Sequence, residues 1–117
     1  MSGEHDICEA VRGYFNAWNS RDLSALSLTL SSDVTLQNWN VHVSGLQEVL
    51  RANGENFESF GDIKIVVDDL LPCLSKRACT CEITVCLNDE VKTQLKVLDV
   101  IRLDALLKVK SVRAYKL

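Results

Sequence analysis

Hydrophobic and polar positions follow two different rhythms in the two parts of the chain. Before residue 61, apolar residues recur mostly three and four positions apart, which predicts amphipathic helices. The first helix is expected over residues 6–22, and a shorter one over 22–33 that stops at Ser31-Ser32-Asp33. Residues 34–40 alternate and predict a strand, and 45–60 predict a third helix.

From residue 62 onward the pattern changes to the alternation of antiparallel strands. Strands are expected over residues 62–74, 77–87, 90–103 and 108–117, joined by short turns. This order predicts an α+β fold in which three N-terminal helices cover one face of a curved sheet. The length of 117 residues, with no linker or repeat, predicts a single domain over 1–117.

One of these strands carries an acid on its apolar face. In "TQLKVLDVIRLD", residues 93–104, Asp99 shares one face with five residues that suit an interior: Thr93, Leu95, Val97, Ile101 and Leu103. An ionised carboxylate there would lose its hydration, so it must be paired, be neutral, or face a cavity. Arg102, Arg113 and a helix N-terminus are the possible structural partners, although neither arginine lies on that face.

Composition and charge narrow the classes of partner. The net charge of −3, without a basic cluster, argues against a nucleic acid or an anionic membrane surface. No apolar run approaches a membrane span, and the N-terminus lacks a signal-peptide pattern, so a cytoplasmic protein is expected. The five cysteines include no C-x-x-C pair and are expected to be reduced, with no metal site and no cofactor.

Three short segments resemble the nuclear transport factor 2-like superfamily, and within it the ketosteroid isomerases. They are "YFNAWNSRDLSAL", which resembles the first-helix signature, "SSDVTLQNWN", and "LDVIRLD" near the C-terminus. The resemblance extends over residues 7–116. It implies a cone: a strongly bent sheet wrapped around helices, with an apolar pocket at one end, in a protein that is commonly a dimer.

The resemblance also assigns roles to individual positions. Tyr14 matches the phenolic donor of the isomerases, and Asp99 matches the carboxylic acid that stays protonated beside it to form an oxyanion hole. The general base of that family is an Asp, where this chain has Asn38, and the Pro that follows is replaced by Trp39. Because an amide cannot take a proton from carbon, the usual base is missing.

Further residues complete the predicted site and a predicted interface. The pocket is expected to be lined by Trp18, Leu36, Phe57, Val97 and Ile101. On the opposite face of the Asp99 strand, Leu98 and Val100 would suit a homodimer interface, or be two scattered apolar residues on a sheet face.

Three functions remain open at this stage. The first is a pocket that binds a small apolar molecule with a carbonyl or phenol oxygen. The second is an isomerase, cyclase or dehydratase whose base has moved to His42, Glu48, Glu55, Glu58 or a water held by Asn38. The third is a dimeric interaction or scaffold domain in which the pocket residues Tyr14, Asn38 and Asp99 are remnants.

Overall fold

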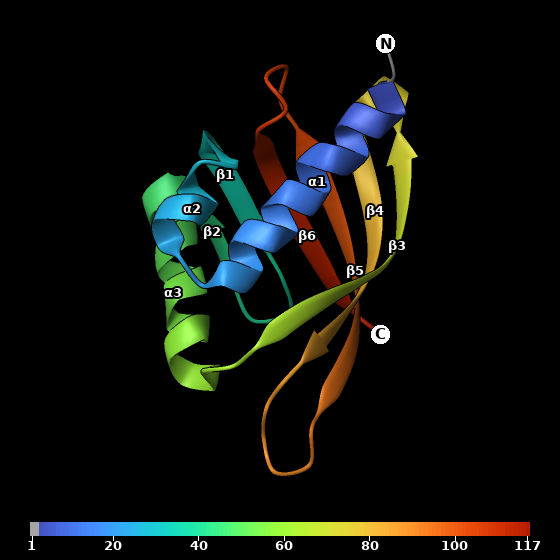
Figure 1. Ribbon diagram of the computed structural model, residues 1–117. Coiled ribbons are helices and arrows are strands. Elements are labelled where there is room, and N and C mark those ends of the chain that lie inside the picture. The colour runs from blue at the N-terminus through green and yellow to red at the C-terminus, as the bar shows by residue number, and fades with distance from the viewer. Residues whose placement is uncertain (1–2) are drawn as a thin grey trace.

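The computed structural model describes residues 3–117, which form three α-helices and six strands in the order drawn in Figure 1. The elements are α1 (Gly3–Ser20), α2 (Leu23–Ser27), β1 (Leu30–Gln37), β2 (His42–Ser44), α3 (Leu46–Phe60), β3 (Lys64–Cys73), the short 3₁₀ helix η1 (Leu74–Lys76), β4 (Ala78–Cys86), β5 (Gln94–Leu103) and β6 (Val109–Lys116).

The six strands form one mixed sheet in the order β2-β1-β6-β5-β4-β3. All neighbouring pairs are antiparallel except β1 and β6, which are parallel. The three helices lie on one side of this sheet, and β3 and β4 bend strongly along their length (Figure 1). A register shift between Val67 and Asp69 of β3 accompanies that bend. The predicted α+β architecture is confirmed.

Helix α1 crosses the concave side of the sheet and buries the stripe that the sequence predicted. Its buried residues recur at helical spacing: Ile7, Val11, Tyr14, Phe15 and Trp18. They pack on the inward residues of the long strands, such as Cys79, Val97 and Ile101. Burial of a stripe of this kind, at about 25 cal/mol per Å² of apolar surface, is what holds a helix on a sheet.

Two predicted boundaries were wrong. The second helix ends at Ser27, and β1 begins at Leu30, so the stretch predicted to close a helix is already strand. Pairing with β6, where Leu30 lies opposite Val109, overrides the local Ser-rich stop signal. Strand β2, which pairs Thr35 with Ser44, was not predicted. It has only three residues, too few for an alternation to be recognised.

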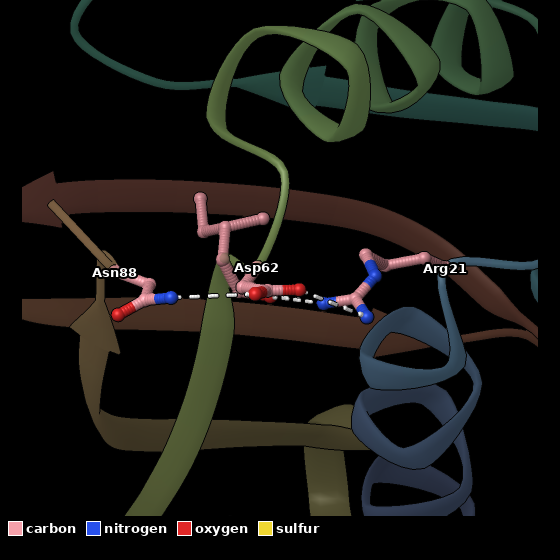
Figure 2. A network of polar contacts seen from close by, with 4 residues as sticks. Arg21, Asp62 and Asn88 are labelled. Atoms are coloured by element: carbon pink, nitrogen blue, oxygen red, sulfur yellow. Dashed lines mark hydrogen bonds and ion pairs between the residues drawn. The ribbon is translucent and has the colours of Figure 1, made fainter.

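The end of α1 is tied to the start of edge strand β3 by polar contacts. The Asn19 side chain donates to the Ile65 carbonyl and accepts from the Ile65 N–H, both at 2.8 Å, as a neighbouring strand would. Figure 2 shows the contacts beside it: Arg21 approaches Asp62 at 3.5 Å, and Asn88, in the β4–β5 connection, donates to Asp62 at 3.3 Å. These contacts connect the end of α1 with the start of β3 and with the β4–β5 connection.

Candidate functional site

Asp99 lies at the centre of β5, on the face that points toward α1. Its neighbours across the sheet are Cys81 of β4 and Ala114 of β6. The residue is only 5% exposed. Its Oδ1 atom is the one fully buried side-chain oxygen or nitrogen within residues 3–117 that has no hydrogen-bond partner. Neither Arg102 nor Arg113 pairs with it, so an ion pair with either arginine does not explain the buried acid.

Burial controls the ionisation of this carboxyl group. Loss of hydration raises the pKa of Asp99 to about 7, from an ordinary value of roughly 3.9. Near neutral pH the acid is therefore protonated in a large fraction of molecules. A protonated carboxyl can donate a hydrogen bond, which a carboxylate cannot.

Tyr14 of α1 is the second polar group of this interior region. Its side chain is buried, and its pKa lies far above the ordinary range because of burial and, next, the negative charge of nearby Asp99. Cys81 adds a smaller effect of the same sign. The phenol therefore stays neutral and keeps its proton. The fold brings Tyr14 and Asp99 into one electrostatic environment, although no hydrogen bond joins the hydroxyl to Asp99 Oδ1.

The buried side chains of Asn53, Ser31 and Thr84 all have hydrogen-bond partners. Asn53 of α3, also 5% exposed, accepts from the Trp18 indole N–H at 2.8 Å and donates to the Val49 carbonyl at 2.9 Å. Ser31 donates to Asp33 at 2.9 Å, and Thr84 bonds Asp68 at 2.6 Å. Asp99 therefore departs from the pattern of its own protein, and an unsatisfied buried group of this kind calls for an explanation.

A cavity of about 200 Å³ opens beside this region, at the end of the fold where α1 and α3 finish. We call it the inner cavity. It is lined entirely by residues without an ionisable side chain: Trp18, Asn38, Trp39, Asn40, Asn56, Phe60, Ile63, Val85, Leu87 and Leu95. Trp18 and Asn38 line it, whereas Tyr14 and Asp99 do not reach its wall.

The depth of the two predicted donors follows from their positions along α1 and β5. Tyr14 is one helical turn before Trp18 on the buried stripe of α1. Asp99 follows Leu95 and Val97 on the inward face of β5. Tyr14 and Asp99 therefore lie farther into the fold than Trp18 and Leu95, beyond the wall of the inner cavity.

Asn38 holds the turn between β1 and β2. Its side-chain oxygen accepts from the backbone N–H groups of Asn40 and Val41, both at 2.8 Å. Its own N–H donates to the Val41 carbonyl at 2.8 Å. This Asx-type turn places Trp39 at the rim of the inner cavity. The residue at the position of the missing base thus has a structural task.

The remaining predicted ligand-binding residues belong to the core. Leu36, Val97 and Ile101 are buried, and Phe57 is half-buried with its ring edge-to-face on Trp18 at 4.9 Å between centroids. None of the four lines the inner cavity.

The cavity wall contains residues that the sequence did not single out, among them Asn40, Asn56 and Phe60. Phe60, at the end of α3, is 49% exposed and lies at the rim of the inner cavity.

The candidate replacement bases lie elsewhere. Glu48 and Glu55 line a separate cavity of about 260 Å³ between α3 and β2, together with Arg51. Glu48 is paired with Arg51 at 3.2 Å. His42 and Glu58 are exposed and line neither cavity.

The described residues contain no group of three or more His, Cys, Asp or Glu side chains placed to hold a metal ion. All five cysteines are free thiols, and the buried Cys81 keeps its proton because the neighbouring Cys79 and burial raise its pKa. Over residues 3–117, no helix combines the length and the apolar character that a membrane crossing requires.

Comparison with known proteins gives structural relatives only. No family model matches the sequence, and no curated protein matches it.

Among solved structures, a putative ketosteroid isomerase from Kribbella flavida has a TM-score of 0.83 at 21% identity, covering 100% of this chain and 82% of that one. A putative SnoaL-like polyketide cyclase from Jannaschia has a TM-score of 0.84 at 14% identity, covering 99% and 88%. An NTF2-like protein from Cytophaga hutchinsonii has a TM-score of 0.77 at 14% identity, covering 94% and 88%.

These likenesses identify the class of fold: a curved mixed sheet that encloses helices. The particular fold is the nuclear transport factor 2-like fold, as the sequence resemblance predicted.

Proposed function

We propose that this protein binds a small, largely apolar molecule inside the cone and holds a carbonyl or phenol oxygen of that molecule with Tyr14 and Asp99. The proposal rests above all on one observation: Oδ1 of Asp99 is fully buried and has no hydrogen-bond partner. An unmade hydrogen bond of this kind costs about 1–3 kcal/mol. A ligand oxygen that accepts from the protonated acid would recover that cost.

The chemistry of the surroundings sets the ligand class. A charged group of a ligand would lose its hydration in the inner cavity and find no counter-charge there, because no ionisable side chain lines the cavity. An apolar ring system with one polar oxygen fits, with the rings beside Trp18 and the oxygen directed toward Tyr14. For the ligand oxygen to reach Tyr14, side chains near Trp18 must move, since the 200 Å³ cavity stops short of Tyr14.

Calorimetric titration with a naphthol tests the proposal. We expect binding in the unmodified protein and a loss of about 1–3 kcal/mol in Tyr14→Phe, which removes the donor and keeps the ring. Absence of binding at millimolar naphthol, or equal affinities in Tyr14→Phe and the unmodified protein, would refute the proposal.

Catalysis by the same site is the alternative. Asn38→Asp places a carboxylate at the position of the missing base and preserves an acceptor for the Asn40 and Val41 N–H groups. If Tyr14 and Asp99 can stabilise an oxyanion, this variant should isomerise a β,γ-unsaturated ketosteroid roughly 10²–10⁴-fold faster than the unmodified protein. Full activity without the substitution would instead indicate an active enzyme with another base.

We also propose that the protein is a cytoplasmic homodimer that associates through the outer sheet face. Leu98 and Val100 are half-buried there, opposite Tyr115 and Arg113 of β6. An apolar strip with a charged rim suits such an interface. Sedimentation of Leu98→Glu should give a monomer; a monomeric unmodified protein would refute the dimer.

A further inference from the structure

A second depression adjoins the inner cavity and differs from it in charge. It has a volume of about 400 Å³ and lies where β1 and β6 end side by side. Its wall includes Asn38, Trp39, Arg113, Tyr115 and Lys116. We call it the cationic groove. No acidic residue lines it, and within residues 3–117 neither Arg113 nor Lys116 forms an ion pair.

The two spaces share a boundary. Asn38 and Trp39 line both the inner cavity and the cationic groove. The Trp39 indole is 43% exposed, and the Lys116 ammonium lies 5.3 Å from its ring centroid. A cation–π contact at an exposed site is weak, so a ligand can displace the indole.

The register of β6 shows on which face of the sheet each of the two cations lies. Lys116 lies opposite Val97, and Ala114 lies opposite Asp99. Because directly opposite residues of an antiparallel pair share a face, Lys116 is on the same side of the sheet as Asp99. Arg113 lies opposite Val100 and is on the other side. The two cations therefore approach the end of the sheet from its two faces.

We infer that the ligand is an amphipathic carboxylate, with its apolar rings in the inner cavity and its acid tail in the cationic groove, passing Trp39. This inference rests on the proposed function and adds the acidic group to it. A carboxylate fits both cations, since a guanidinium binds it through two parallel N–H bonds and an ammonium acts as a point charge. The uncharged inner cavity excludes the reverse orientation, with the acid inside.

The test compares a naphthol that carries a propanoic acid tail with its uncharged propanamide, by calorimetry at low ionic strength. The acid is expected to bind roughly 5- to 10-fold more tightly than the amide, the range that two partly exposed ion pairs supply. Lys116→Gln and Arg113→Gln should each reduce this preference about 2- to 3-fold and leave the affinity for the amide unchanged. Raising the salt concentration should reduce it as well.

Lys110→Gln is the matched control, because Lys110 is an exposed lysine of the same strand and lines neither space. Its preference for the acid should equal that of the unmodified protein. The inference is overturned if the acid binds no more tightly than the amide, or if the preference survives in the double variant. Tight binding of the amide alone would overturn this inference and leave the proposed function intact, whereas binding of neither compound would refute both.

Discussion

Asn53 and Asp99 are equally buried, each 5% exposed, and yet their hydrogen bonding is opposite. Asn53 joins α3 to α1 through the Trp18 indole and satisfies its own amide on Val49. Asp99, on β5, has an oxygen with no partner at all. A polar side chain that serves the fold is bonded within it, while one left open at a net cost is available to something else. The contrast separates a structural site from a candidate binding site.

The largest expected difference between Asp99 and Asn53 is in how each makes the stability of the protein depend on pH. Asp99 has a folded pKa of about 7 and an unfolded pKa of roughly 3.9. Between these values the unfolded chain releases a proton that the folded chain keeps, so Asp99 makes the protein less stable as the pH rises from about 4 to about 7. The contribution is on the order of 4 kcal/mol, since each pKa unit is worth about 1.4 kcal/mol.

Asp99→Asn removes this dependence and keeps nearly the same shape. Urea denaturation at pH 4 and pH 8 should therefore find the variant close to the unmodified protein at pH 4 and more stable than it at pH 8. A variant that is less stable by about 1 kcal/mol or more at pH 8 would mean that Asp99 is an ionised structural partner.

Asn53→Ala should have the next largest effect, and with the opposite sign. It leaves the Trp18 indole N–H buried without an acceptor, so we expect a loss of about 2–3 kcal/mol in the free energy of unfolding at every pH between 4 and 8. Denaturation followed by circular dichroism measures it. A loss below about 0.5 kcal/mol would show that the Asn53–Trp18 bond does not hold α3 to α1.

Tyr14→Phe should have the smallest effect on stability. The hydroxyl makes no bond to Asp99 Oδ1, so its removal should change the free energy of unfolding by less than about 0.5 kcal/mol. The same denaturation experiment applies. A larger loss would place Tyr14 with Asn53, as a residue that serves the fold.

The sequence predicted the fold well because its periodicities were strong. The stripe from Ile7 to Trp18 and the alternation around Asp99 each identified an inward face, and Asp99 was conspicuous as an acid on an apolar one. The predicted end of the second helix was wrong because a strand pairing with β6, remote in sequence, outweighed a local turn signal.

The candidate site was less predictable. Asn38 matched a base position by resemblance, but its turn-forming bonds depend on the path of the chain through Val41. The partnership of Asn53 with Trp18 joins residues 35 positions apart, which no local pattern encodes. The rim residues of the inner cavity come from five segments of the chain, so only their assembly in space defines it.

The most direct test of the account is the pKa of Asp99 itself, measured by carbon-13 NMR of the side-chain carboxyl with and without saturating naphthol. We predict titration near pH 7 in the free protein. Because a ligand oxygen that accepts from Asp99 favours the protonated acid, the pKa should rise further when the naphthol is bound. A carboxyl that titrates at or below about 4, or whose pKa is unmoved by the bound naphthol, would contradict the assignment of Asp99 as the ligand-binding acid.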